Sequence, residues 1–126
     1  MNVGKVLGIG GVFFKVGDND EVRDWYAKVL GFEVADWGGV VFPHPAKGYQ
    51  VWSPFKADTN YFDPSPHPMM INLIVDDLDE VLAKARAAGV DALNRDDTDP
   101  SGRFAWLLDP MGIKVELWEP KEPATP

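Results

Sequence analysis

A short sequence pattern occurs twice in this chain at a constant separation, and it constrains the fold more than any other feature. Residues 16–22 read Val-Gly-Asp-Asn-Asp-Glu-Val, and residues 75–81 read Val-Asp-Asp-Leu-Asp-Glu-Val. The two segments agree at five positions and lie 59 residues apart. A repeat constrains the architecture, because each copy is expected to form the same supersecondary unit. The chain is therefore predicted to contain two copies of one unit.

Both copies of the pattern predict the start of a helix. An Asp can cap the first amide groups, and a Glu three residues later can bond back to the Asp. These pairs are Asp18 with Glu21 and Asp77 with Glu80. The apolar residues that follow recur at helical spacing: Val22, Trp25, Tyr26, Val29 and Leu30 in the first copy, and Leu78, Val81, Leu82 and Ala85 in the second. Each copy is expected to form a helix of about three turns, ending at a glycine, Gly31 or Gly89, in a left-handed cap.

Alternating apolar residues before and after each helix predict strands. In the first copy the predicted strands are 9–16, 33–37, 40–42 and 49–52; in the second they are 70–75, 91–93, 103–108 and 113–118. This pattern divides the chain into module one at about 5–55, a linker rich in Pro and polar residues at about 56–68, module two at about 69–120, and a tail at 121–126.

Length and composition limit the kind of protein. A chain of 126 residues with 45% hydrophobic residues is predicted to be one globular domain. The absence of Cys excludes disulfides and thiolate metal sites. The formal charge of −8 disfavours nucleic acid and is consistent either with solubility or with attraction of a cationic ligand. No apolar run reaches the length of a membrane span and no leader is recognised, so a cytoplasmic location without membrane contact is expected.

Two motifs give the repeat a family resemblance. Residues 25–32 read Trp-Tyr-Ala-Lys-Val-Leu-Gly-Phe, and residues 109–117 read Asp-Pro-Met-Gly-Ile-Lys-Val-Glu-Leu. Together with the repeat, they resemble the vicinal oxygen chelate superfamily of glyoxalase I, extradiol dioxygenases and bleomycin-resistance proteins. The resemblance implies an α+β fold in which two tandem βαβββ modules form a curved mixed sheet around a shared cleft, with the helices outside. It also implies a homodimer, with exchange of modules possible through the linker.

The resemblance further implies four metal-ligand positions in the cleft. Those positions are here Gly11, Trp52, Met70 and Glu116. Only Glu116 can bind a metal through its side chain, whereas a mononuclear site needs three or four protein ligands. His44 and His67 both precede prolines in loops and are interpreted as surface residues. No cofactor is expected, and a divalent metal is disfavoured because its ligands would have to come from elsewhere.

Strand alternation gives a separate prediction of the cleft face. If the turn at 109–112 closes a regular hairpin, Glu116 lies opposite Ala105. Residues 103, 105, 114, 116 and 118 would then face the cleft. Phe104, Trp106, Val115 and Leu117 would face the helices, which makes Trp106 a predicted core residue.

Glu116 is the candidate catalytic residue, as a base or as a surviving metal ligand; an ion pair with Arg103 or Lys114 is the alternative interpretation. The candidate ligand-binding residues are Phe13, Trp52, Met70, Asn72, Arg103 and Trp118. The aromatic members offer flat apolar walls, although each could instead pack within the sheet or an interface. The leading hypothesis is a metal-free protein that sequesters an aromatic or cationic small molecule. A metal-dependent lyase, isomerase or dioxygenase and a non-catalytic scaffold or regulatory module are the alternatives.

Overall fold

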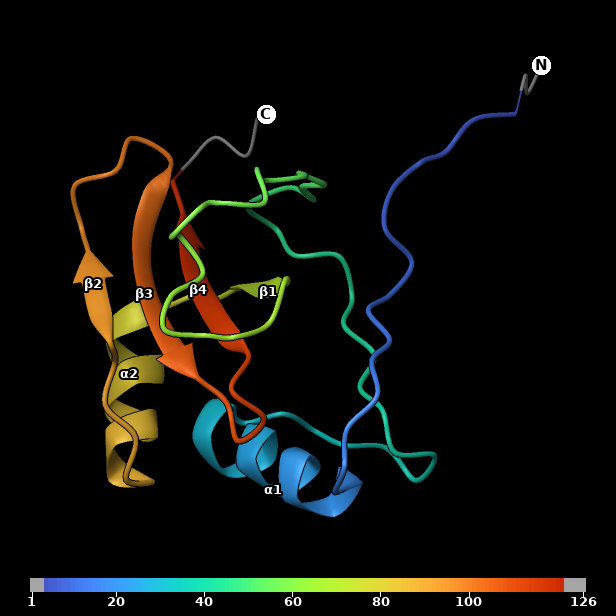
Figure 1. Ribbon diagram of the computed structural model, residues 1–126, viewed down its shortest axis with the longest axis vertical. Coiled ribbons are helices and arrows are strands. Elements are labelled where there is room, and N and C mark those ends of the chain that lie inside the picture. Colours follow the sequence, from blue (N-terminus) through green and yellow to red (C-terminus); the bar gives the residue numbers. More distant parts are fainter. Residues whose placement is uncertain (1–3, 122–126) are drawn as a thin grey trace.

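The computed structural model describes residues 4–121, which form an α+β fold with a curved mixed sheet and two helices (Figure 1). The elements are α1 (Asn19–Leu30), β1 (Met70–Ile74), α2 (Leu78–Ala87), β2 (Asn94–Asp96), β3 (Gly102–Leu108) and β4 (Lys114–Pro120). Within this part of the chain, neither helix is long and apolar enough to cross a bilayer.

The sheet is built entirely from the second copy of the repeat. Its strand order is β1-β4-β3-β2, with β1 parallel to β4 and the other neighbours antiparallel. Because α2 connects β1 to the remaining strands, residues 70–120 form the predicted βαβββ unit. The second strand predicted for this copy, at 91–93, forms slightly later in the chain, as β2.

The repeated pattern caps both helices as predicted. The Asp18 carboxylate accepts a hydrogen bond of 3.0 Å from the amide of Glu21, and the Asp77 carboxylate accepts one of 3.1 Å from the amide of Glu80. Gly31 closes α1 with φ of 73°, in the left-handed region that favours glycine. The repeat therefore fixes where each helix begins.

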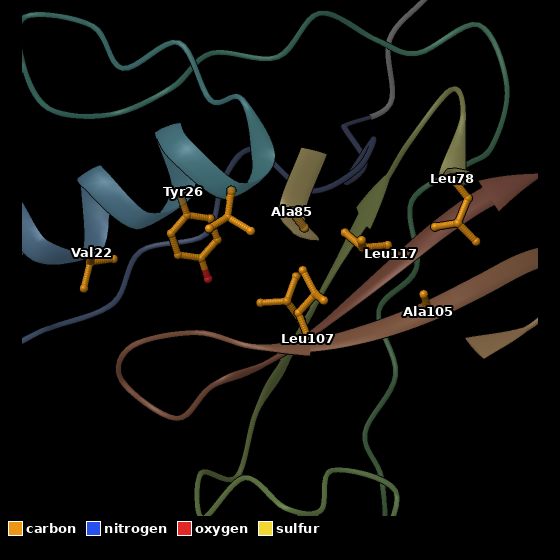
Figure 2. Close-up of a cluster of buried hydrophobic side chains, with 9 residues drawn as sticks. Val22, Tyr26, Leu78, Ala85, Ala105, Leu107 and Leu117 are labelled. Atoms are coloured by element: carbon orange, nitrogen blue, oxygen red, sulfur yellow. The ribbon is translucent and has the colours of Figure 1, made fainter. Parts of the chain in front are cut away.

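One face of the sheet packs against the two helices to form the core (Figure 2). The core residues are Val22, Tyr26, Val29, Leu78, Ala85, Ala105, Leu107, Val115 and Leu117. Alternate residues of β3 and β4 point to this face, as the period of two in a strand requires. The remaining residues of both strands point to the opposite face, which the helices leave uncovered (Figure 1).

The register of the β3–β4 hairpin differs from the prediction by one residue. Glu116 lies opposite Trp106 instead of Ala105, and Leu108 lies opposite Lys114. The connection holds five residues because the Asp109 carboxylate accepts the amides of Met111 at 2.8 Å and Ile113 at 2.9 Å. A shift of one residue moves every β3 side chain to the other face. Phe104 and Trp106 therefore share a face with Glu116, and Trp106 is not part of the helix-side core.

A buried hydrogen bond connects the first helix to this hairpin. The Tyr26 hydroxyl donates to the Asp109 carboxylate over 2.7 Å, and both residues are buried. Burial, followed by the hydrogen bond to Asp109 and its charge, raises the pKa of Tyr26, so the hydroxyl stays protonated as a donor. Asp109 thus holds its own turn and anchors α1.

The strands predicted for the first copy, 9–16, 33–37, 40–42 and 49–52, do not form in this structure. These segments form no ladder with the four-stranded sheet (Figure 1). They share isolated contacts, such as the 2.5 Å bond from the Ile9 amide to the Gln50 side chain and the ring contact of Tyr49 with Trp118 on β4. A strand requires a continuous ladder to a neighbour, and none connects these segments. Val6, Leu7 and Phe13 consequently lie about nine-tenths exposed.

Replacing Tyr26 by Phe is expected to lower the free energy of unfolding by about 1–3 kcal/mol, because the buried Asp109 carboxylate loses a donor. Urea denaturation followed by circular dichroism measures this change. Tyr49→Phe is the control, since the Tyr49 ring contact with Trp118 does not need the hydroxyl. Equal stability of Y26F and wild type would show that the bond does not anchor α1.

Candidate functional site

The sheet face turned away from the helices gathers polar and aromatic side chains around one carboxylate. Glu116, on β4, lies between Asn72 on β1 and Trp106 on β3, its register partners on either side. Tyr61, from the 56–68 linker, reaches the same carboxylate. The linker, β1 and the β3–β4 hairpin therefore meet at Glu116.

Glu116 is only 8% exposed, and its carboxylate accepts three hydrogen bonds from uncharged donors. Asn72 donates to Oε1 over 2.7 Å, and Trp106 donates its indole N–H to Oε2 over 2.8 Å. The Tyr61 hydroxyl makes a short hydrogen bond to Oε2. Since a carboxylate offers roughly four acceptor positions, one position on Oε1 is left for a further donor.

The Tyr61 hydroxyl acts in this site as a donor. Burial, followed by the hydrogen bond and charge of Glu116, raises the pKa of Tyr61. A phenol in this environment keeps its proton near neutral pH. Tyr61 therefore contributes a hydrogen-bond donor to Glu116 and not a phenolate base.

Aromatic rings form a row beside the carboxylate. The Phe104 ring lies nearly parallel to those of Trp106 and Trp118, with centroid distances of 6.2 and 6.1 Å. Tyr49 packs edge-on against Trp118 at 5.1 Å. Such offset contacts create flat apolar surfaces next to polar groups, a combination suited to a planar ligand.

Lys114 lies at the edge of this site and makes no ion pair with Glu116 within 4.0 Å. Its ammonium instead sits 5.2 Å from the centroid of the Tyr61 ring and 5.6 Å from that of Trp106. It also donates to the Tyr61 carbonyl oxygen over 2.6 Å. Within residues 4–121, the ion pair of Glu116 with Arg103 or Lys114, which was the alternative interpretation, does not form.

Arg103 lies on the other face of the sheet, which corrects the prediction that it lines the cleft. It pairs with Glu119 at 2.7 Å and with Asp79 of α2 at 3.1 Å. The same one-residue change of register is responsible, since Arg103 alternates with Phe104 along β3. Arg103 therefore belongs to an ion-pair network that connects the sheet to α2 through Glu119 and Asp79.

The other predicted ligand-binding residues behave differently in the two modules: those of module two lie on the sheet, and those of module one do not. Asn72 contacts Glu116, Met70 begins β1 opposite Lys114, and Trp118 is buried with its indole N–H donating to Ser101 over 3.0 Å. Phe13 and Trp52 are 90% and 81% exposed, respectively. They belong to the unpaired segments, and this structure does not bring them to Glu116.

Sequence reasoning missed two residues that contact Glu116. Trp106 was assigned to the core because a regular hairpin places it on the helix side. Tyr61 was not considered because it lies in a linker. The sequence did offer a signal for a packed linker, because aromatic residues cluster there. In the structure, Tyr61 and Phe62 of the linker pack against Phe55, the residue just before it.

The residues at the implied metal positions do not fit a metal. Gly11, Trp52 and Met70 offer no ligating side chain, and three donors already occupy the Glu116 oxygens. His67 lies elsewhere, with Nε2 2.7 Å from the Met111 carbonyl oxygen. Across the described residues, no three His, Asp or Glu side chains gather closely enough to hold an ion.

Comparison with known proteins identifies the family. The family model "Glyoxalase/Bleomycin resistance protein/Dioxygenase superfamily" matches residues 8–117. The chain belongs to this superfamily. The match spans both modules and includes β1, α2 and the β3–β4 hairpin, so Glu116 lies in the matched region.

Several solved structures of similar length share the fold. TnmS3, an antibiotic binding protein from Streptomyces sp. CB03234, is 25% identical, with 84% of this chain and 89% of that chain covered and a TM-score of 0.54. A glyoxalase/bleomycin resistance protein from the same strain is 23% identical, with 82% and 93% covered and a TM-score of 0.52. TioX from Micromonospora sp. ML1 is 22% identical, with 87% and 94% covered and a TM-score of 0.51. No curated protein matches the chain significantly.

Replacing Arg103 by Gln is expected to make stability less dependent on pH. The hydrogen bonds from Arg103 lower the pKa of Glu119, so this contribution is complete above the usual glutamate pKa and is lost as pH falls through the lowered value. R103Q should be less stable than wild type at pH 7, and the difference from wild type should shrink below about pH 4. Urea denaturation at pH 3–8 measures it.

Arg86→Gln is the control, because the Arg86–Asp91 pair is about 80% exposed on both sides. It should leave the stability curve unchanged at every pH. A loss in R103Q that persists undiminished at pH 3 would contradict an ionic origin.

Proposed function

We propose that this superfamily member is a metal-free binding protein that sequesters an aromatic or cationic small molecule on the sheet face turned away from the helices. The observation that carries the proposal is the Glu116 carboxylate, buried beside aromatic rings and bonded only to uncharged donors. A buried charge without an ionic partner is costly. A ligand that brings positive charge to Glu116 would compensate that cost.

The aromatic row supports the same ligand class. Phe104, Trp106 and Trp118 form a row of nearly parallel rings beside Glu116, of which Trp106 and Trp118 are buried. The remaining acceptor position on Glu116 can bond a ligand N–H. The net charge of −8 favours the approach of a cation. The 25% identical relative TnmS3 is described as an antibiotic binding protein, which agrees with a sequestering role.

The rival function is a metal-dependent lyase, isomerase or dioxygenase that retains Glu116. It would need ligands beyond the four implied positions, together with release of the Glu116 oxygens from their donors. The donor set described above therefore favours binding without an ion. A cytoplasmic location stays a prediction from the sequence.

Replacing Glu116 by Gln is expected to weaken binding of a cationic planar aromatic at least tenfold, because the amide removes the negative charge but preserves the shape. Isothermal titration with cationic dyes and with neutral planar aromatics measures the effect. Neutral aromatics should lose little affinity. Glu80→Gln is the matched control, since Glu80 lies exposed at the start of α2 and its replacement changes the net charge equally.

Metal analysis of the protein purified without chelator separates the alternatives. Near-stoichiometric Zn, Ni, Mn, Fe or Co that disappears in E116Q would overturn the proposal in favour of the enzyme. Absence of both metal and ligand binding would favour the scaffold.

We further propose that the protein acts as a homodimer. The chain exposes 9172 Å², whereas a folded monomer of 14.0 kDa exposes about 6,700 Å². The excess is roughly 2,500 Å² per chain, and obligate dimers bury about 2,000–5,000 Å² in total. Among residues 4–121, thirteen of the fifteen large exposed apolar side chains lie at 6–55, where the predicted strands lack partners. A second copy supplies matching strand segments and covers these side chains.

Light scattering during gel filtration is expected to give twice the 14.0 kDa of one chain. Phe13→Asp should shift the protein towards the monomer or lower its stability, because Phe13 is 90% exposed in one chain and is covered in the dimer. Leu93→Asp is the control, an exposed apolar residue of module two. A wild-type mass of one chain across micromolar concentrations would rule out the dimer.

A further inference from the structure

A positive charge already occupies the aromatic part of the site. The rings of Tyr61 and Trp106 stand at 88° to each other with centroids 6.3 Å apart. The Lys114 ammonium lies over both rings, 5.2 and 5.6 Å from their centroids. Two ring faces at nearly right angles form an electron-rich corner, which attracts a cation through the ring quadrupoles.

The surroundings of this corner add further negative potential. The Tyr61 carbonyl oxygen accepts from the ammonium over 2.6 Å, and both rings also donate their polar hydrogens to Glu116. Donation to a carboxylate pushes electron density into each ring and strengthens its attraction for a cation. The corner is thus complementary to any ammonium group, because its contacts are all to the ammonium of Lys114 and not to the rest of that side chain.

Lys114 is attached in a way that allows exchange. Its backbone is fixed as the first residue of β4, but its ammonium stands at the end of a flexible four-carbon stem and lies in a solvent-exposed hydrogen bond. A change of rotamer removes the ammonium from the corner without moving the strand. A ligand cation placed there keeps both ring contacts and also comes close to Glu116.

We infer that Tyr61 and Trp106 form a subsite for an organic ammonium group, and that Lys114 fills this subsite in the free protein and lowers the affinity for such ligands. The inference rests on the proposed binding function and specifies its ligand class and its regulation. A ligand with a quaternary or tertiary ammonium displaces Lys114, whereas a neutral ligand of the same shape gains nothing from the subsite. An internal competitor reduces apparent affinity by the fraction of time that it occupies the site.

The test uses two probes of equal shape, phenyltrimethylammonium and neutral tert-butylbenzene, with wild type and two variants. Lys114→Met removes the internal cation but keeps an unbranched apolar stem, so it should bind phenyltrimethylammonium roughly tenfold more tightly. Lys114→Arg keeps a cation and should bind as weakly as wild type. Isothermal titration gives the dissociation constants, and circular dichroism confirms that each variant folds.

Lys121→Met is the charge-matched control. It removes one positive charge at the far end of β4, about 20 Å from Lys114, and should leave both affinities unchanged. If K114M does not fold, Lys114→Gln replaces it, with the same expectation.

The outcomes separate the two proposals. Tighter binding of phenyltrimethylammonium alone in K114M supports the subsite. An equal gain for both probes, or no gain, overturns the subsite but leaves the proposed binding function if planar aromatics bind the wild type. Failure of every probe and aromatic to bind any variant overturns both.

Discussion

The carboxylate of Asp109 is the constraint on which the rest of the structure depends. By accepting two amides of its own turn, it sets a connection of five residues and thereby the register of β3 against β4. By accepting the Tyr26 hydroxyl, it attaches α1 to the same corner. In a two-faced sheet, register decides which side chains enter the core and which face outward. One buried carboxylate therefore determines both the packing of the helices and the composition of the candidate site.

The site is a direct consequence of that register. With Glu116 opposite Trp106, the indole N–H reaches the carboxylate, whereas the regular hairpin would have placed Ala105 there. The linker then contributes Tyr61, which covers the carboxylate from the solvent side. Glu116 is stable in this position because three donors replace its lost hydration, yet none of them neutralises its charge. The same contacts that bury the residue thus leave it able to attract a cation.

How much the sequence predicts depends on the range of the interactions involved. The repeat located both helix starts, because a cap forms between residues three apart. It also located the βαβββ unit of the second copy, whereas the hydrogen bond between Asn72 and Glu116 was not predicted. The faces assigned to Arg103 and Trp106 were wrong, since they depend on the hydrogen bonds of one turn side chain. Tyr61 escaped notice because its role arises from contact across 55 residues of sequence. Alternation predicted strands in the first copy that do not form in this structure, because alternation cannot supply the neighbouring strand that a hydrogen-bonded ladder needs.

The repeat gives the missing strands a defined place relative to the site. At the offset of 59 residues, Phe13 corresponds to Asn72 and Gly11 corresponds to Met70. In the second copy, Asn72 faces Glu116 from β1. In the proposed dimer, a first-copy strand with the same pairing presents Phe13 at the equivalent position, so one wall of the cleft is polar and the other apolar. A duplicated fold with four metal ligands would need similar chemistry on both walls. Here the copies have diverged to a carboxylate with donors on one side and an aromatic ring on the other, which suits a molecule with a charged end and a flat apolar body.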